Sequence, residues 1–393
     1  MGRIVVVGAG FSGSIIARRI AEDMGRHVEI IERRSHIGGN AYDEYDEKTG
    51  ILVQRYGPHY LNTNKYSVIK FVKQYAELFP HDAKLLSFID GNYVQLPFNF
   101  RTMRQLVGDE KAEGLLASLR KAFCGRDRVP IMELLKSDDP AVREYGNLLF
   151  DKAYKTYTAK MWGIGVDEID RSVLERVPMA MSYDGRYLNK DFQYLPIKGF
   201  TEIFRNMLDH PNITVTMNED ALTHITFDEG RRQVMYDGEE IECLVFTGPI
   251  DELFGMKYGA LPYRSLDIRY EYSDGDSVLP EEIISYPQAP GYIRSTEYRK
   301  IMFDARNVKG SIVATEYPMK YDMNAPVGNI PYYPVLTSDS IAAYKRYLDE
   351  VKTYRNIFLC GRLAEFKYYN MDICIEHALE YAENIKEYLE NAK

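Results

Sequence analysis

The stretch from Arg3 to Asn40 places the tightest constraint on how this chain can fold. An apolar run, Ile4–Val7, leads into Gly8-Ala9-Gly10-Phe11-Ser12-Gly13 and then into a segment whose apolar residues have helical spacing. A second apolar run, Val28–Ile31, ends at Glu32. In such a unit the glycines let the backbone approach a pyrophosphate at the helix N-terminus, and the acidic residue accepts hydrogen bonds from a ribose. The stretch therefore predicts a dinucleotide-binding βαβ unit.

Further glycines follow soon after Glu32, in Gly38-Gly39-Asn40, and Arg34 lies between Glu32 and these glycines. A second close backbone approach at this point resembles the FAD-binding proteins of the glutathione-reductase type more than the nicotinamide dehydrogenases. The resemblance implies FAD as the cofactor. A strand, glycine and helix pattern returns at Ile357–Cys360, Gly361-Arg362 and Asn370, so we expect both ends of the chain to contribute. The residues expected to bind the cofactor are Gly8, Gly10, Phe11, Ser12, Gly13, Glu32, Arg33, Gly39, Asn40, His59, Gly361, Arg362, Tyr369, Asn370, Met371 and Asp372.

The composition excludes several classes of protein. With 393 residues, the chain exceeds the usual size of a single core, and two or three structural units are expected. A net charge of −9 without a basic stripe argues against nucleic-acid binding. No apolar run is long enough to span a membrane and no signal peptide precedes the first strand, so we expect a cytoplasmic protein. The cysteines lack metal-binding spacing and are expected to be reduced packing residues, with no metal site; they are Cys124, Cys243, Cys360 and Cys374.

The order of the patterns predicts a mixed α/β fold, in which a Rossmann-like FAD-binding domain is interrupted by a helical domain and an antiparallel sheet domain. The helical pattern covers residues 84–195, and one helix is expected to run from Pro140 to about Trp162. In residues 266–317, apolar and polar side chains alternate, as they do in the strands of an antiparallel sheet. We expect the FAD-binding domain in residues 1–83, 196–248 and 351–393, the helical domain in 84–195 with a mobile substrate loop at about 163–177, and the sheet domain in 249–350.

Motifs spread over the whole chain carry a second resemblance. In order, they are Tyr157–Gly163, Arg176–Pro178, Asp184–Tyr187, Thr247–Asp251, Tyr263–Leu266, Tyr292–Arg294, Glu316–Pro318, Pro331–Val335 and Gly361–Asp372. This ordered set resembles bacterial UDP-galactopyranose mutases. A nucleotide sugar carries a diphosphate, and the guanidinium fork of arginine matches phosphate oxygens.

The resemblance implies roles for particular residues. Arg176 and Arg294 would hold the diphosphate and act in catalysis, and the remaining substrate-binding residues would be Tyr157, Thr158, Trp162, Tyr187, Arg264, Tyr317 and Tyr368. The alternatives are an ordinary ion pair for each arginine, and core packing for the tryptophan and the tyrosines.

The resemblance also implies an isomerase that interconverts UDP-galactopyranose and UDP-galactofuranose for cell-surface polysaccharide biosynthesis. Reduced flavin N5 would be the nucleophile at the anomeric carbon, so no nucleophilic side chain is required of the protein. An external reductant, either NAD(P)H or a reductase, and a homodimer are expected on the same grounds.

Two positions depart from the family pattern: Met161 stands where glutamine is usual, and Asn62 where a second histidine is usual. The departures leave the sugar open, so UDP-N-acetylgalactosamine or another UDP-hexose is an alternative substrate. Two other classes of function remain alternatives. One is a flavin oxidoreductase of the amine-oxidase type, and the other is a non-catalytic FAD protein that senses a nucleotide sugar.

Overall fold

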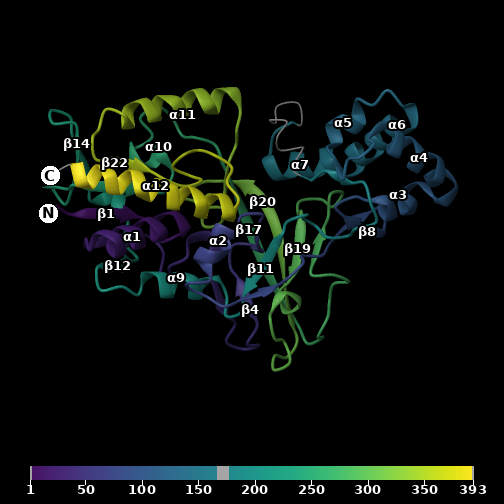
Figure 1. Ribbon diagram of the computed structural model, residues 1–393, viewed down its shortest axis with the longest axis horizontal. Coiled ribbons are helices and arrows are strands. Elements are labelled where there is room, and N and C mark those ends of the chain that lie inside the picture. Colours follow the sequence, from purple (N-terminus) through teal and green to yellow (C-terminus); the bar gives the residue numbers. More distant parts are fainter. Residues whose placement is uncertain (1, 166–176, 392–393) are drawn as a thin grey trace.

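The computed structural model describes residues 2–165 and 177–391. A five-stranded parallel sheet with the order β12-β2-β1-β16-β22 organises one end of this part of the molecule (Figure 1). Its strands are β1 (Ile4–Val7), β2 (Val28–Glu32), β12 (Ile213–Met217), β16 (Cys243–Phe246) and β22 (Ile357–Leu359). The predicted βαβ unit is present, and the sheet joins strands from both ends of the chain as the sequence predicts.

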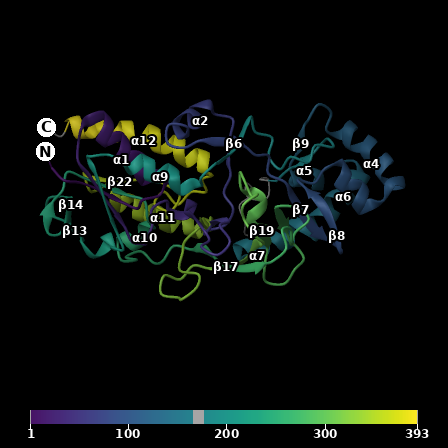
Figure 2. The same cartoon turned by 90° about the horizontal axis from the view of Figure 1, so that it is seen from below.

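Helices cover both faces of this sheet, because successive side chains of a strand point to opposite faces. Ile4 and Val6 belong to the core that α1 (Phe11–Met24) and α12 (Met371–Asn391) cover, together with α2 (Tyr66–Val72) and α9 (Phe200–Leu208). Val5 belongs to the opposite core, with α10 (Ile250–Leu253) and α11 (Ser338–Val351). A sheet buried on both faces explains why its strands read as continuous apolar runs. Figure 2 shows the same layers from below.

A seven-stranded sheet with the order β21-β17-β20-β19-β18-β7-β8 lies beside the parallel sheet. Its longest strands, β17 (Tyr263–Ser273) and β20 (Ser311–Lys320), pair antiparallel along their length, as the alternating pattern predicts. The other members are β18 (Ile283–Ser285), β19 (Arg294–Glu297), β21 (Tyr333–Pro334), β7 (Leu85–Ile89) and β8 (Asn92–Leu96). The β7–β18 pair is parallel, so the sheet is mixed.

The helical region begins later than the sequence analysis expects. Residues 85–96 form the β7–β8 hairpin because Leu85, Ser87 and Ile89 are buried at every second position, which is the period of a strand. Residues 192–196 are also a strand. The helices between them are α3 (Phe100–Val107), α4 (Asp109–Ala122), α5 (Ile131–Leu135), α6 (Pro140–Leu149) and α7 (Lys155–Trp162). The helix predicted from Pro140 to Trp162 is confirmed, with a π-helical turn at Phe150–Tyr154 between α6 and α7.

Short elements complete the described chain. The strands are β3 (Asp43–Tyr45), β4 (Leu52–Gln54), β5 (Leu61–Thr63), β6 (Leu78–Pro80), β9 (Arg128–Val129), β10 (Met179–Ala180), β11 (Phe192–Pro196), β13 (Ile225–Asp228), β14 (Gln233–Tyr236) and β15 (Glu239–Glu240). Short 3-10 helices occur at Gly39–Ala41, Ala221–Thr223 and Tyr298–Ile301.

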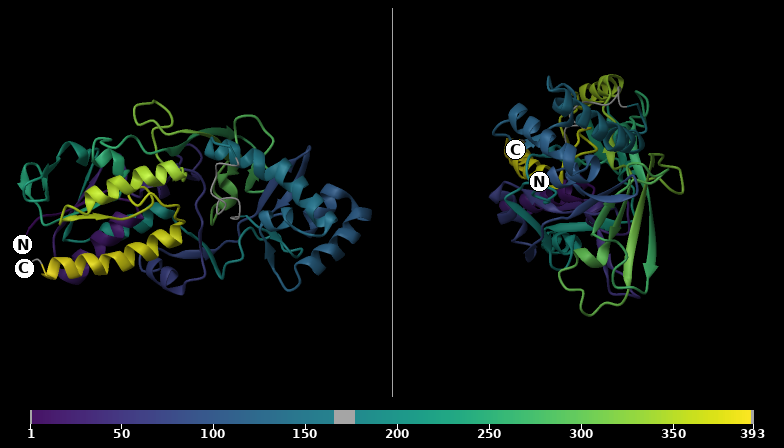
Figure 3. Two further views of the ribbon diagram at one scale, coloured as in Figure 1. Left: turned by 90° about the horizontal axis from the view of Figure 1, so that it is seen from above. Right: turned by 90° about the vertical axis from the view of Figure 1, so that its right-hand side faces the viewer.

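The molecule is elongated, with both chain ends at the end opposite the α3–α6 helices (Figures 1 and 3). The seven-stranded sheet and α7 occupy the middle. Among the described helices, none has the length and apolar character required to cross a lipid bilayer.

Candidate functional site: a dinucleotide cavity beside an arginine–glutamate pair and an aromatic cluster

The turn between β1 and α1 brings backbone atoms unusually close together. A Cβ atom at Gly13 would lie 2.0 Å from the Gly8 carbonyl oxygen, so only glycine allows α1 to pack this closely against β1. Gly8 has a φ of +100°, in the left-handed region that favours glycine. Gly10 caps α1 without a side-chain hydrogen bond, which leaves the first N–H groups of the helix to a ligand.

The predicted acidic residue is buried at the end of β2. The Glu32 Oε2 atom accepts a hydrogen bond from the Ala9 N–H at 2.9 Å, and its Oε1 atom accepts one from the Arg34 N–H at 3.0 Å. These bonds fix the carboxylate at the glycine turn and leave further lone pairs for ribose hydroxyl groups. The second glycine turn packs on the first, because a Cβ atom at Gly39 would lie 3.1 Å from the Gly10 Cα atom.

A cavity of about 1210 Å³, which includes the space open to solvent at its mouth, runs along these turns. Most of the residues predicted to bind the cofactor line it: Gly8, Gly10, Phe11, Ser12, Glu32, Arg33, Gly39, Asn40, His59, Gly361, Arg362 and Met371. The predicted residues Gly13, Tyr369, Asn370 and Asp372 are not among those that line it. Sequence reasoning missed Arg34, Asp220, Thr247, Gly248, Tyr332 and Cys374 as lining residues. Thr247 and Gly248 were detectable, because they follow a strand parallel to β1 and ligands bind at the carboxyl edge of parallel strands.

Two neighbouring arginines have different partners at this cavity. Arg33 Nη1 donates to the buried Glu252 Oε2 at 3.1 Å, so an internal carboxylate neutralises its charge. Arg34 Nη2 donates to Asn40 Oδ1 at 2.8 Å, while its Nη1 atom is buried with no hydrogen-bond partner among the described residues. An acceptor on a bound dinucleotide would satisfy this donor. The residues present therefore fit a dinucleotide, with Arg34 better placed than Arg33 to donate to it.

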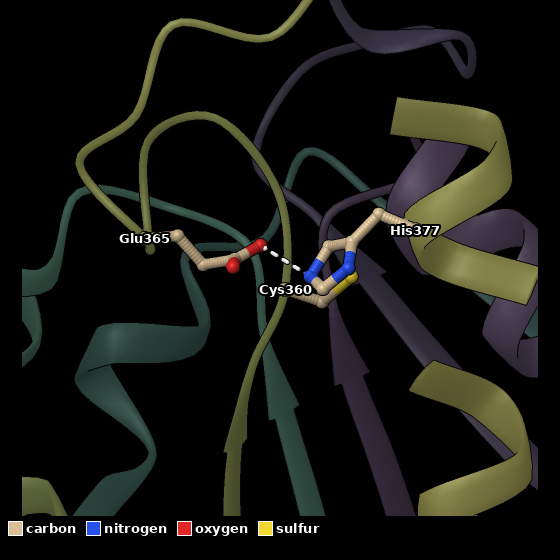
Figure 4. A group of neighbouring side chains, drawn as sticks. All are labelled: Cys360, Glu365 and His377. Atoms are coloured by element: carbon tan, nitrogen blue, oxygen red, sulfur yellow. Dashed lines mark ion pairs between the residues drawn. The ribbon is translucent and has the colours of Figure 1, made fainter. Parts of the chain in front are cut away.

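The loop after β22 is braced by a partly buried group of side chains. Figure 4 shows Cys360, Glu365 and His377 pointing toward one another, and their potential ligand atoms lie within 4.8 Å of each other. The Glu365 carboxylate accepts hydrogen bonds from the Gly361 N–H at 2.8 Å and the Tyr369 hydroxyl at 3.1 Å, and it lies 2.9 Å from His377 Nε2. Burial raises the pKa of the Cys360 thiol, which keeps it protonated. These contacts hold the loop that presents Gly361 and Arg362 to the cavity.

Arg294, at the start of β19, is paired with a carboxylate that sequence reasoning did not single out. Its Nε atom donates to Glu316 Oε1 at 2.9 Å and its Nη2 atom donates to Glu316 Oε2 at 2.7 Å. Glu316 lies on the adjacent strand β20 and its side chain is 1% exposed. The bidentate pair fixes the plane of the guanidinium. Burial raises the pKa of the Tyr157 phenol, and both members of the pair are near enough for their charges to affect that pKa.

Three aromatic residues form a cluster next to this pair, which we call the aromatic cluster: Trp162, Tyr333 and Tyr368. The rings of Tyr333 and Tyr368 stack at 5.1 Å, and the Trp162 ring lies 6.2 and 6.1 Å from them. The Arg362 guanidinium lies over both tyrosine rings, at 5.1 and 5.4 Å. Tyr333 interacts electrostatically with both Arg362 and Arg294.

His59 joins the dinucleotide cavity to the Arg294–Glu316 pair. It lines the cavity and interacts electrostatically with Arg362 and Arg294. Burial and these two cations lower its pKa to about 4, so the imidazole is neutral at pH 7. Its Nδ1 atom lies 2.8 Å from the Gly57 carbonyl oxygen. Because a carbonyl only accepts, Nδ1 carries the proton and Nε2 offers a lone pair.

The remaining predicted substrate residues occupy several places. Thr158 is buried on α7, and Tyr187 is one of the neighbouring groups that raise the pKa of Tyr157. Tyr317 is on β20, 4.1 Å from the Arg269 guanidinium. Arg264 uses two of its five donors to bind backbone carbonyls at the end of α7, so it holds that helix. Arg176 and most of the predicted mobile loop lie outside the described residues.

Comparison with known proteins agrees with this geometry. Residues 152–368 match the protein family described as UDP-galactopyranose mutase, and residues 6–75 match the NAD(P)-binding Rossmann-like domain. The chain is 34% identical to the dTDP-fucopyranose mutase of Escherichia coli over 98% of each chain. It is 32% identical to the UDP-galactopyranose mutase of Mycoplasma pneumoniae, over 97% of this chain and 95% of that one.

A solved structure of reduced UDP-galactopyranose mutase superposes with a TM-score of 0.72 at 16% identity, covering 98% of this chain and 94% of that one. A putative protoporphyrinogen oxidase from Exiguobacterium superposes with a TM-score of 0.69 at 15% identity, covering 99% of both chains. Fold and site together define a dinucleotide-binding α/β enzyme whose cofactor is FAD. The chain belongs to the UDP-galactopyranose mutase family, as the sequence analysis predicts, and it is an isomerase.

Proposed function

We propose that this enzyme interconverts UDP-galactopyranose and UDP-galactofuranose. The observation that carries the proposal is the junction of two sites, in which His59 and Arg362 of the dinucleotide cavity interact with Arg294 and the aromatic cluster. A sugar bound at that junction would lie beside the flavin ring. When bound and reduced, FAD supplies a nucleophilic N5 atom for the anomeric carbon.

Arg294 neutralises the diphosphate of the substrate in this proposal. A guanidinium has five N–H donors, and Glu316 accepts from two of them, which leaves three for phosphate oxygens. The buried carboxylate holds the fork in one orientation, so less conformational entropy is lost when the diphosphate binds. Arg176 is proposed as the second cation for the departing UDP, as the family resemblance implies.

The aromatic side chains would give the junction a low dielectric and exclude water. Trp162, Tyr333 and Tyr368 pack against one another with Arg362 over the tyrosine rings. In such a setting, the attraction between a guanidinium and a phosphate is stronger than in water. Tyr157 and Tyr187 are proposed to donate hydrogen bonds to the same diphosphate or to the sugar. The enzyme would work as a homodimer supplied with electrons by NAD(P)H or a reductase.

A dTDP-6-deoxyhexose, dTDP-fucose, is the second candidate substrate. The chain is 34% identical to an E. coli enzyme named for that sugar nucleotide. In addition, Met161 packs its apolar thioether against Trp162 and Val335, at the position where the family usually has a polar glutamine. Less polar surroundings would favour a sugar that lacks a hydroxyl group.

The test is turnover by the purified flavoprotein, reduced with dithionite under anaerobic conditions, with UDP-galactofuranose and dTDP-fucopyranose as separate substrates. Chromatography should show ring-isomerised product from at least one of them, and only when the flavin is reduced. Arg294→Ala should retain FAD but lose about 2–4 kcal/mol of transition-state stabilisation, a 30- to 1000-fold decrease in kcat/KM.

Arg306→Ala is the matched control, because Arg306 is an exposed arginine that pairs with Asp304 and has no proposed role. The kcat/KM of this variant should equal that of wild type. Reduced wild-type protein that isomerises neither sugar nucleotide would overturn the proposal. Stoichiometric reduction of oxidised FAD by a substrate would instead support an oxidoreductase.

A further inference from the structure

Helix α7 carries Tyr157 and Trp162, and its last turn is held by a lysine that has no role in the proposed chemistry. The Lys160 Nζ atom donates to three backbone carbonyl oxygens, those of Tyr286 and Ala289 at 2.7 Å and that of Tyr292 at 2.9 Å. An ammonium group has three N–H donors, and all three are satisfied by these carbonyls. Lys160 is half-buried, and burial lowers its pKa to about 8, so the ammonium form still predominates at pH 7.

The three acceptors belong to one turn, residues 286–292, which connects β18 to β19. The turn is closed by a hydrogen bond of 2.8 Å from the Tyr286 N–H to the Ile293 carbonyl, and the rings of Tyr286 and Tyr292 meet edge to face at 5.0 Å. Arg294 is the first residue of β19, two positions after the last acceptor. A shift of this turn would therefore move the Arg294 guanidinium.

A second cation holds the same end of α7 from β17. The Arg264 Nε atom donates to the Met161 carbonyl at 2.7 Å, and its Nη2 atom donates to the Lys160 carbonyl at 3.1 Å. These are carbonyls of the last helical turn, where a positive charge is favoured by the helix dipole. A Cβ atom at Gly163 would lie 2.5 Å from Arg264 Nη1, so the glycine that ends α7 leaves the space for this contact.

We propose that Lys160 is a positioning residue that fixes the separation between the α7 side chains Tyr157 and Trp162 and the Arg294 guanidinium, and so sets the affinity for the nucleoside diphosphate. The inference rests on the proposed function for the identity of the ligand. Lys160 acts through the 286–292 turn and does not touch the substrate itself. Lysine suits the position because its donors diverge from one point, whereas the planar fork of arginine cannot direct three bonds to three converging carbonyls.

The test compares Lys160→Met, Lys160→Arg and Lys160→Ala with Lys155→Met, whose exposed lysine lies on the same helix. Each variant is purified with its flavin and titrated with UDP and dTDP at pH 7. Binding is read from the fluorescence of Trp162, the only tryptophan in the chain, and confirmed by calorimetry. Steady-state kinetics with the better sugar nucleotide then separates KM from kcat.

We expect Lys160→Met to retain FAD and to bind the nucleotide roughly 10- to 100-fold more weakly, the scale at which misplaced positioning groups act. KM should rise more than kcat falls, Lys160→Arg should recover part of the loss, and Lys155→Met should match wild type. n-Propylammonium added to Lys160→Ala should restore affinity, whereas 1-propanol, which fills the same space without donating three bonds, should not.

Nucleotide affinity in Lys160→Met within twofold of wild type would overturn the inference, and so would equal rescue of Lys160→Ala by the alcohol. This failure is distinguishable from failure of the proposed function. If the proposed function is wrong, wild-type protein isomerises no sugar nucleotide. If only the role of Lys160 is wrong, wild-type protein is active and the Lys160 variants bind the nucleotide as tightly as wild type does.

Discussion

The glycine turn offers the sharpest quantitative prediction. In Gly13→Ala the new Cβ atom would lie 2.0 Å from the Gly8 carbonyl oxygen and 3.0 Å from Val6 Cγ1. A carbon approaches a carbonyl oxygen to about 3.3 Å, so α1 must retreat from β1 by about 1.3 Å. Overpacking of this kind costs about 1–3 kcal/mol. Because the strain falls on the turn that faces the pyrophosphate, we expect FAD affinity to fall about 5- to 150-fold.

Two other glycines serve as controls for this experiment. A Cβ atom at Gly10 would meet only the Gly39 Cα atom, at an ordinary 3.7 Å, so Gly10→Ala tests the approach of the ligand and not internal packing. Gly10→Ala should leave the fold of the flavin-free protein intact and still weaken the binding of FAD. A methyl group at Gly114, in α4, would meet nothing within 4 Å beyond the backbone of its own helix and its chain neighbours. Gly114→Ala should therefore bind FAD normally and gain up to about 1 kcal/mol of stability.

The assay is titration of flavin-free protein with FAD, followed by flavin fluorescence, together with urea unfolding of the same samples. Wild-type FAD affinity in Gly13→Ala would refute the steric reasoning. Loss of FAD affinity in Gly114→Ala would show that the assay reports general damage instead of the turn.

Two further predictions concern charge. Because the pKa of His59 is lowered to about 4 in the folded protein and is ordinarily 6.5, the unfolded chain takes up the proton first, so stability is lost as the pH falls from about 6.5 to about 4. The loss is at most about 3 kcal/mol, and urea unfolding of flavin-free His59→Gln should lack this pH dependence. Glu316→Gln should destabilise the protein by about 3 kcal/mol and raise KM, because it leaves Arg294 without its buried carboxylate. Urea unfolding and steady-state kinetics measure the two effects, with the exposed Glu271→Gln as the control. Equal stability of the two variants would contradict this account.

The elements predicted correctly are those whose pattern is local. The β1 and α1 unit follows from an apolar run, a glycine turn and a helical period, and the helix from Pro140 has its predicted cap, since Asp139 accepts hydrogen bonds from the Ala141 and Val142 N–H groups. The β7–β8 hairpin was missed because short alternating runs next to helices give a weak signal, and pairing with β18, some 200 residues away, is what completes it.

The candidate site divides in the same way. Twelve of the residues expected at the cofactor do line the cavity, since glycine turns and strand ends determine their place. Arg264 and Arg294 are both arginines beside aromatic residues in the sequence, yet one binds carbonyls at the end of α7 and the other binds Glu316. No local pattern distinguishes them, because their partners come from distant elements.

The sequence by itself determined the parallel sheet with its dinucleotide turn and the order of motifs that identifies the family, because strand period, helix period and glycine geometry act over a few neighbouring residues. The tertiary structure alone decided which charged groups remain available to a ligand. Arg33 is neutralised by Glu252, Arg34 keeps an unpaired donor at the cavity, and Lys160 ties α7 to the turn before Arg294. Ion pairs and hydrogen bonds form between groups that are close in space, whatever their separation in the sequence. The pKa of a buried charged group, and its availability to a ligand, therefore depend on the partner that the fold places beside it.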